Sequence, residues 1–400
     1  MILSGKRIVL GVTGSIAAYK AVYLASSLTK FGATVDTVMT SAAARFVGPV
    51  SFEGLTGRPA YTSVMQSTPE GEIAHVALGS TAQAVVIAPA TAGTIARLAA
   101  GMASDILTAT VLSSTAPVVI APAMESEMYL SAVTRENLQT LQSRGATVVE
   151  PETGRLASGR QGPGRMAEPD RIIDILRGVL GRDGPLAGRK IVVTAGGTRG
   201  QIDPVRFIGN PSSGRQGIAI AAEARDRGAR VSLILGHHSH PPPAGVQLLH
   251  TPSYAAMRDA VINETAGCDA LIMAAAVNDF EAAQASPGKI KKSGTGLTLS
   301  LAENPDFLLD LSDDMVKVGF AAETGELKKN AESKLAEKRL DAIVANDVTE
   351  EGAGFASPTN HVRILRRGAE WNDVPLGTKE SVAEKIVDVV QELVRDRRTG

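Results

Sequence analysis

The sequence is poor in several residue types and patterns, and each shortage excludes a class of protein. The chain of 400 residues has a single cysteine, Cys268, which excludes an intramolecular disulfide framework and a cysteine-rich metal site. Phe, Trp and Tyr make up only 4%, so few rings are present to stack on bases of single-stranded nucleic acid. Lys and Arg (41) nearly balance Asp and Glu (42), which leaves no charge field suited to nucleic acid or a membrane surface.

Long apolar runs are also missing. The apolar segment after Lys6 and Arg7 is too brief for the core of a signal peptide, and no apolar stretch reaches the length of about 18 residues that spans a bilayer. We therefore expect a cytoplasmic protein without nucleic-acid or membrane partners. A chain of 400 residues exceeds what one hydrophobic core usually serves, which favours two domains.

Short apolar strands alternate with helical patterns throughout, which is typical of α/β folds with parallel sheets. The Gly- and Pro-rich segment 181–188 interrupts this alternation. We predict two Rossmann-like domains in series, residues 1–181 and 189–400, joined by a linker at 182–188. The expected strands are 7–13, 34–40, 84–88, 118–121 and 147–149 in the first domain, and 190–194, 230–235, 270–276, 316–321 and 342–345 in the second.

The most informative motif follows the first strand of the second domain. The sequence AGGTR (195–199) ends a β-branched strand, and IDPVR (202–206) and NPSSG (210–214) lead into a helical pattern at 216–227. A glycine turn with serines before a helix is typical of phosphate binding. Together with the basic segment KIKK (289–292), it indicates activation of a carboxylate by a nucleoside triphosphate.

Two residues of this region are candidates for the chemistry. The Asn210 amide can donate to an acyl oxygen without adding charge. The alternative, an ordinary N-cap, is less favoured because Asn210 precedes the helix by more than one residue. Lys289 follows a segment typical of a mobile loop and could close over pyrophosphate; the alternative is a solvated basic loop.

The first domain carries a similar but weaker pattern. A Gly- and hydroxyl-rich turn (11–21, GVTGSIAAYKA) separates its first strand and helix, which suits a phosphate but also occurs for packing alone. The segments 88–92 and 121–124 follow two further strands, at the strand ends where doubly wound sheets bind ligands. His75 lies in a connecting segment and is either functional or a packing residue. The histidine- and proline-rich segment 237–243 is read as a solvated loop rather than a metal tract.

These motifs resemble known families. GVTGSIAAYKA, VIAPATA (86–92), PAM (122–124) and GPGRM (162–166) resemble the FMN-binding cysteine decarboxylases. The ligase-like half, with the motifs above plus MAAAV (273–277), NPD (304–306), GFAAET (319–324) and VANDV (344–348), resembles phosphopantothenate–cysteine ligase. In this order they resemble the bifunctional decarboxylase/ligase family of coenzyme A synthesis. The resemblance implies a flavodoxin-like domain followed by a ligase domain with a mainly parallel sheet.

The resemblance also implies the ligands. FMN would be bound in the first domain and CTP in the second, with 4′-phosphopantothenate and cysteine as the other substrates. Mg²⁺ is implied by the triphosphate chemistry, and its ligands are not visible in the sequence. The choice of CTP over ATP rests on resemblance alone. A homo-oligomer is implied as well: trimers of the flavin domain and dimers of the ligase domain, which combine into a dodecamer.

The implied site residues fall into three groups. The catalytic set is His75, Ser158, Asn210 and Lys289. The FMN-binding set is Gly14, Ser15, Ile16, Thr40, Ala88, Pro89, Ala90, Thr91 and Met124. The nucleotide-binding set is Ala274, Ala275, Ala276, Asp279, Lys289, Pro305, Asp306, Phe307, Phe320, Lys334 and Lys338.

Three positions of the first domain depart from the family pattern. Glu125 and Gly93 replace asparagines, and Ser158 replaces the cysteine that protonates the unsaturated thiol after CO₂ has left. Serine has a far higher pKa than a thiol, so Ser158 is a poor general acid, and Glu125 could donate the proton instead. The alternatives are therefore an active decarboxylase, a flavoprotein that is impaired or stops at the enethiol, and a non-catalytic scaffold for oligomerisation.

Overall fold

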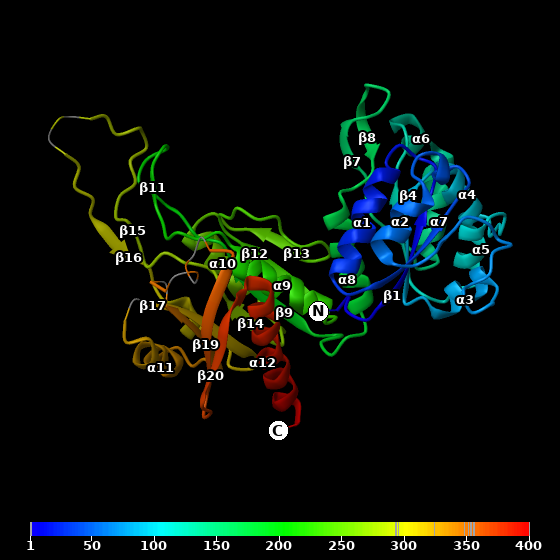
Figure 1. Cartoon of the computed structure of the whole chain (residues 1–400). Helices are drawn as coiled ribbons and strands as arrows, with labels where there is room; N and C mark the ends of the chain where they lie inside the picture. The colour runs from blue at the N-terminus through cyan, green and yellow to red at the C-terminus, as the bar shows by residue number, and fades with distance from the viewer. Residues whose placement is uncertain are drawn as a thin grey trace. The chain divides into compact units, whose positions relative to one another are not determined.

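The computed structural model describes residues 2–292, 294, 296–323, 325–347, 349–350, 352, 354 and 357–399. The chain divides into two compact units, Met1–Gly181 and Arg182–Gly400 (Figure 1). Leu186, within the segment predicted as a linker, is buried in the core of the second unit, and its N–H donates to the Arg227 carbonyl. Among the described residues, no helix has the length and apolar content needed to cross a membrane.

The first unit is built on a parallel sheet with strands in the order β3-β2-β1-β4-β5-β6. An antiparallel hairpin of β7 and β8 lies outside this sheet. The strands are β1 (Arg7–Val12), β2 (Thr34–Met39), β3 (Ala60–Tyr61), β4 (Ala84–Ala90), β5 (Val118–Pro122), β6 (Thr147–Val148), β7 (Glu152–Arg155) and β8 (Gln161–Arg165). The helices are α1 (Ala18–Lys30), α2 (Pro49–Thr56), α3 (Ala74–Thr81), α4 (Ala92–Ala99), α5 (Ile106–Leu112), α6 (Ser126–Leu130), α7 (Ala132–Ser143) and α8 (Pro169–Gly181).

Both faces of this sheet are covered by helices, as alternation along β1 requires. Ile8, Leu10 and Val12 point into a core shared with α1, α2 and α8, whereas Val9 belongs to the core that α3, α4, α5 and α7 complete. Without the two-residue edge strand β3, the order is that of a flavodoxin-like sheet. The strand order reverses between β1 and β4, so ligands are expected above the carboxyl ends of these two strands.

The second unit has a larger sheet in the order β13-β12-β9-β14-β17-β18-β19-β20, in which the pairs up to β18 are parallel and the last two pairs antiparallel. Its strands are β9 (Lys190–Ala195), β12 (Arg230–Leu235), β13 (Gln247–His250), β14 (Ala270–Met273), β17 (Val316–Glu323), β18 (Ala342–Asp347), β19 (Thr359–Arg366) and β20 (Trp371–Thr378). Two short antiparallel pairs stand apart: β10 (Gly200–Gln201) with β11 (Phe207–Ile208), and β15 (Phe280–Ala282) with β16 (Leu301–Glu303).

The helices of the second unit pack on both faces of its sheet. They are α9 (Arg215–Asp226), α10 (Tyr254–Glu264), α11 (Leu327–Glu337) and α12 (Lys379–Thr399). On β9, Ile191 and Val193 join the core under α9 and α12, and Val192 joins the core under α10. The sheet order reverses between β9 and β14, which marks the second switch point of the chain.

Several strand and helix limits differ from those predicted. Strand β14 ends at Met273 rather than at residue 276, because the regular ladder with β9 is interrupted after Met273, although Ala276 forms one further parallel bridge with Gly197. Helix α9 begins one residue earlier than predicted and ends at Asp226. The predicted family motifs at 319–324 and 344–348 end on Thr324 and Val348, which lie outside the described residues.

Candidate nucleotide and flavin sites

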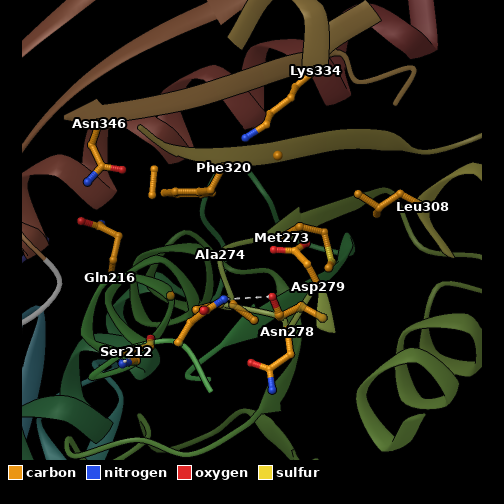
Figure 2. A pocket seen from close by; sticks show the side chains of 18 of the residues that line it. Ser212, Gln216, Met273, Ala274, Asn278, Asp279, Leu308, Phe320, Lys334 and Asn346 are labelled. Carbon is orange, nitrogen blue, oxygen red and sulfur yellow. Dashed lines mark hydrogen bonds between the residues drawn. The ribbon is translucent and has the colours of Figure 1, made fainter. Parts of the chain in front are cut away.

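A cavity of about 520 Å³ opens at the switch point of the second unit. Its wall is formed by the turn before α9, the segment after β14, the turn at 303–308, and residues of β17, α11, β18, β19 and α12 (Figure 2). The lining includes Asn210 and all of the predicted nucleotide-binding residues except Lys289, namely Ala274, Ala275, Ala276, Asp279, Pro305, Asp306, Phe307, Phe320, Lys334 and Lys338.

Close backbone approaches shape the floor of this cavity. Gly196 has φ +78°, and a Cβ there would lie 2.6 Å from the His237 carbonyl oxygen. Gly217, in the first turn of α9, would place a Cβ 2.6 Å from the Cβ of Ala195, so α9 can begin against the sheet only with glycine at this position. The N-terminus of α9, from Gly214 to Gly217, therefore faces the cavity.

Asn210 lies in the loop between β11 and α9. Its Nδ2 donates to the Val277 carbonyl at 3.2 Å, which ties this loop to the segment after β14. The N-cap of α9 is Gly214, so the alternative role of Asn210 as the cap of this helix is wrong.

The segment after β14 is held by a set of hydrogen bonds around Asn278. The Asn278 N–H donates to Thr198 Oγ1 at 2.9 Å, and its Nδ2 donates to the Ile208 carbonyl at 3.1 Å. Asn304 Nδ2 donates to the Asn278 carbonyl at 2.9 Å. These bonds hold the backbone of 274–279 in place, where its peptide groups can meet a base edge.

The turn at 303–308 supplies apolar and charged groups. Phe307 is buried and packs edge-on against Tyr254, with 5.9 Å between the ring centroids. The Tyr254 hydroxyl donates to the Pro305 carbonyl. Phe320 is half-buried, packs against the core and also lines the cavity, so one ring can serve the core and face a ligand.

Lys334 and Lys338 both line the cavity, and each forms an ion pair with a carboxylate outside α11. Lys334 Nζ lies 2.7 Å from Glu323 Oε1, and Lys338 Nζ lies 2.9 Å from Asp306 Oδ2. Although burial opposes it, the hydrogen bonds from Lys334 and Asn330 lower the pKa of Glu323 below its usual value. A bound polyphosphate would compete with these carboxylates for the two ammonium groups.

Lys289 is exposed and does not line the cavity, but its segment is fixed at the next residue. The buried Asp203 accepts the Ile290 N–H at 3.2 Å, and Arg206 Nη1 donates to the Ile290 carbonyl at 3.1 Å. Arg206 and Asp203 also form an ion pair at 2.7 Å. Burial alone would raise the pKa of Asp203, yet the N–H groups of Val205, Arg206 and Ile290 hold it below its usual value.

In the first unit, the predicted FMN-binding residues come from the loops that follow β1, β2, β4 and β5. Thr13 joins two of these loops, because its Oγ1 donates to the Pro89 carbonyl at 2.7 Å and accepts the Thr91 N–H at 3.1 Å. Gly14 lies so close to Ala42 that an added Cβ would be 2.5 Å from the Ala42 side chain. Ser15 and Ile16 lie in the turn before α1, Thr40 follows β2, Ala88 to Ala90 end β4, and Met124 follows β5.

Four buried polar side-chain atoms among the described residues of the first unit lack partners, and two of them, on His75 and Glu125, belong to residues with a proposed role in the chemistry. His75 Nδ1, in the first turn of α3, and Glu125 Oε1, after β5, have no hydrogen-bond partner among the described residues. A buried polar atom without a partner costs stability, so each such atom points to an additional group at the site.

Ser158 lies at the exposed tip of the hairpin formed by β7 and β8. The base of this hairpin is anchored beside Met124. The Met124 N–H donates to the Gly164 carbonyl at 3.0 Å, and Ser126 Oγ donates to the Pro163 carbonyl at 2.7 Å. Gly164 is required by this contact, since a Cβ would lie 2.3 Å from the Met124 carbonyl oxygen.

The histidine-rich segment lies in the loop between β12 and β13. It lines a second cavity of about 250 Å³, in which His238 and His250 stack with 6.2 Å between ring centroids. No group of three or more His, Cys, Asp or Glu side chains within the described ranges is arranged to hold a metal ion. Residues that sequence reasoning missed line the first cavity instead: Gln216, Asn346, Asn360 and Lys379.

Comparison with known families agrees with this two-part architecture. Residues 2–181 match the family model described as "Flavoprotein", and residues 186–394 match "DNA/pantothenate metabolism flavoprotein C-terminal domain". The fold and the matches define a two-domain flavoprotein.

The curated relatives narrow this class. The coenzyme A biosynthesis bifunctional protein CoaBC of Mycobacterium tuberculosis is 44% identical over 404 residues, covering 96% of both chains. The protein of the same name from Bacillus subtilis is 40% identical over 404 residues, covering 100% of this chain and 99% of that one. A crystal structure of the C-terminal domain of a CoaBC protein is 34% identical, with a TM-score of 0.46, covering 53% of this chain and 99% of that chain. The chain belongs to the family of bifunctional coenzyme A biosynthesis proteins.

Proposed function

We propose that the protein catalyses two consecutive steps of coenzyme A synthesis. The second unit joins 4′-phosphopantothenate to cysteine with CTP, and the first decarboxylates the product, 4′-phosphopantothenoylcysteine, with FMN. The observation that carries the proposal is the convergence of Asn210 and all of the predicted nucleotide-binding residues except Lys289 on one cavity. We also propose that the protein is a cytoplasmic homo-oligomer. The exposed apolar side chains of Ile16, Tyr19 and Tyr23 on the first unit support an oligomer. Light scattering would measure the mass of the assembly.

In the ligation, the substrate carboxylate attacks the α-phosphorus of CTP, and pyrophosphate leaves. The cysteine amine then attacks the acyl carbon of the acyl-cytidylate, the amine loses a proton, and CMP leaves. The N-terminus of α9 would hold phosphate oxygens, and Lys334 and Lys338 would neutralise charge as pyrophosphate departs. Mg²⁺ would be held largely by phosphates and water, and the cavity wall offers the carboxylates of Asp279, Glu303 and Asp306.

One incubation tests the ligase proposal directly. Purified protein is supplied with 4′-phosphopantothenate, cysteine, MgCl₂ and either CTP or ATP, and the products are identified by mass spectrometry. Formation of phosphopantothenoylcysteine or its decarboxylated product together with CMP supports the proposal. Preferential AMP formation would overturn the choice of CTP, and the absence of any amide product would overturn ligation itself. Omission of MgCl₂ with added chelator is expected to stop pyrophosphate release.

The residues of the first unit fit a flavin. Thr13 joins the loops after β1 and β4 by hydrogen bonds at the switch point of the sheet. The buried atoms His75 Nδ1 and Glu125 Oε1 have no hydrogen-bond partner among the described residues, and a bound ligand could supply one. Gly14, Ser15 and Ile16 would hold the phosphate, and Ala88 to Thr91 the ring system. Bound FMN would accept two electrons from the substrate thiol and return them after CO₂ leaves. His75 would hold or move a proton at the reacting end of the substrate.

We predict that Ser158→Cys speeds release of the saturated thiol about tenfold or more, because a thiol is a far better general acid than a hydroxyl. The wild type is expected to accumulate the enethiol, which is two mass units lighter. Glu125→Asn in addition removes a buried carboxylate that would oppose the substrate carboxylate. Rapid-quench mass spectrometry of both thiols measures the effect.

The control for this comparison is Ser143→Cys, which adds a thiol at an exposed position at the end of α7. It should leave the product ratio unchanged. If the wild type already releases the saturated thiol at a rate that neither Ser158→Cys nor the double variant improves, another group donates the proton and Ser158 does not limit the reaction.

A further prediction concerns the support of Lys289. Asp203→Asn replaces one carboxylate oxygen by an N–H₂ group, which cannot accept the Ile290 N–H or pair with Arg206. The segment that carries Lys289 then loses the hydrogen bond from the Ile290 N–H to the loop between β10 and β11, and Arg206, which donates to the Ile290 carbonyl, loses its ion-pair partner. We expect kcat for ligation by Asp203→Asn to fall about tenfold, with a smaller change in KM for CTP. Lys289→Ala is expected to lower kcat by a similar factor.

The matched control is Asp259→Asn, which breaks an exposed ion pair with Arg258 on α10. It should change neither constant. An Asp203→Asn variant that turns over like the wild type, while Lys289→Ala is impaired, would show that Lys289 does not depend on the Asp203–Ile290 contact.

A further inference from the structure

One end of the large cavity is lined by residues that the proposed function leaves without a role. In Figure 2, Gln216 and Asn346 lie near each other, on the opposite side of Phe320 from Met273, Asp279 and Leu308. Gln216 comes from α9 and Asn346 from β18. Asn360 of β19 and Lys379 of α12 line the same cavity.

Two cationic residues line this end, Arg215 and the more deeply buried Lys379. Lys379 is the first residue of α12, and the residue is only 4% exposed although it lines the cavity. Burial and then the positive charge of Arg215 lower the pKa of the Lys379 ammonium, and the Glu380 carboxylate opposes them. Glu380 is itself engaged by Arg215 at 3.1 Å. An ammonium group that is removed from water in this way gains most from an anion that enters the cavity.

Hydrogen bonds join Lys379 to the start of α9. Gln216 Nε2 donates to the Lys379 carbonyl at 3.1 Å, and Gln216 Oε1 accepts from Asn360 Nδ2 at 3.3 Å. The Gln216 side chain is thus held at both ends of its amide. This arrangement links the first turns of α9 and α12 to strand β19.

Asn360 supplies an independent sign of a ligand. The residue is 5% exposed, and its Oδ1 is buried without a hydrogen-bond partner within the part of the chain that the structure describes. A buried carbonyl oxygen without a hydrogen bond is energetically costly, and a hydroxyl or amide N–H of a ligand could donate the missing hydrogen bond. The ligand that fits this end is therefore anionic at one point and carries a donor nearby.

We propose that Lys379, together with the N-terminus of α9, binds a phosphoryl group of a ligase substrate. The backbone N–H groups at the start of α9 and the ammonium of Lys379 would donate to the phosphoryl oxygens, and Asn360 Oδ1 would accept from a hydroxyl or amide group of the same ligand. The inference rests on the proposed function, which supplies two sources of this chemistry. One is the triphosphate of CTP, and the other is the phosphate of 4′-phosphopantothenate.

Calorimetric titration of the full-length protein with CTP, and separately with 4′-phosphopantothenate, tests the proposal without requiring turnover. Lys379→Met keeps the length of the side chain and removes its charge, so the Kd for one ligand should rise about 10- to 100-fold. Lys379→Arg keeps the charge and should recover part of the affinity. The control Lys385→Met removes an exposed lysine on the same helix and should bind both ligands as the wild type does.

The two sources and the failures give distinct results. If Lys379→Met raises the Kd for CTP alone, the phosphoryl group bound at Lys379 belongs to the nucleotide. If it raises the Kd for 4′-phosphopantothenate alone, that phosphoryl group belongs to the acyl substrate. If Lys379→Met binds both ligands within twofold of the wild type, the proposal is overturned, even where the wild type ligates normally. A wild type that binds neither ligand overturns it as well, and a product assay on that protein decides the proposed function separately. Should Lys379→Met fail to fold, Asn360→Leu replaces it as the test variant, and unchanged binding of both ligands by Asn360→Leu would overturn the proposal.

Discussion

Asn210→Ala is expected to slow ligation about 10²- to 10³-fold, the usual loss when one donor to a developing oxyanion is removed. Asn210 lines the cavity beside the N-terminus of α9, and its amide plane is fixed by the bond from Nδ2 to the Val277 carbonyl. An amide nitrogen has two N–H donors. The second is the one that we expect to reach the acyl oxygen, where negative charge grows as the cysteine amine attacks.

The measurement separates the two half-reactions. Rapid quench resolves pyrophosphate release, which reports acyl-cytidylate formation, from CMP release, which reports its use by cysteine. Asn210→Asp is the informative companion, because it keeps the shape but places a negative charge against the acyl oxygen, so its loss should exceed that of Asn210→Ala. CTP affinity should stay within about threefold of the wild type. Near-wild-type CMP release by Asn210→Ala would remove Asn210 from the catalytic set.

The convergence of several predicted nucleotide-binding residues on one cavity could be anticipated because the sheet is mainly parallel. Ala274 to Ala276 follow β14 and Phe320 lies in the carboxyl half of β17, and the carboxyl ends of parallel strands meet at one edge of the sheet. Pro305 to Phe307 precede β17, so this rule does not place them in the cavity wall. The position of Lys338 in the cavity wall follows less directly from the sequence. Its four-residue spacing from Lys334 predicts a shared helix face, but the face that meets Asp306 depends on the packing of α11 against β17 and β18.

The far end of the cavity could not be predicted, because it is built from antiparallel additions to the sheet. Asn360 lies on β19, which pairs antiparallel with β18. Lys379 follows β20 and begins the last helix, α12. In the sequence, Lys379 is one charged residue before an amphipathic pattern, which is most often a solvated position. In the fold, α12 packs against α9, β19 and β20, and Lys379 is buried.

The link between Lys289 and Asp203 was also out of reach of sequence reasoning. The sequence predicts a mobile lysine in a basic loop, whereas the backbone of the next residue, Ile290, is held by both Asp203 and Arg206. These contacts join loop residues more than 80 positions apart, since Asp203 and Arg206 lie between β10 and β11 and Ile290 lies between β15 and β16. Loop residues show no helix or strand periodicity, so the contact follows from tertiary structure alone.

His75→Asn is expected to lower decarboxylation about 10²- to 10⁴-fold, the range for loss of a positioned acid or base. The only imidazole of the first unit has a buried Nδ1 without a partner among the described residues, at the start of α3. A histidine that served only in packing would be expected to bond this atom within the protein, since unpaired buried nitrogens are costly. We therefore infer that the ring is placed for the ligand, where it would hold or move a proton of the substrate.

Three readouts on one variant decide between the catalytic and the packing role of His75. A catalytic role predicts lost CO₂ release, with the flavin content and Tm of the wild type and unchanged ligation, because ligation takes place in the other unit. A packing role predicts a lower Tm with decarboxylation reduced only in proportion to unfolded protein. Ser80→Ala, at the exposed far end of α3, is the control and should change none of these values. If the His75→Asn variant retains decarboxylation, His75 has a structural role and its imidazole does not take part in the reaction. The proton would then be moved by Glu125 or by a group of the substrate itself.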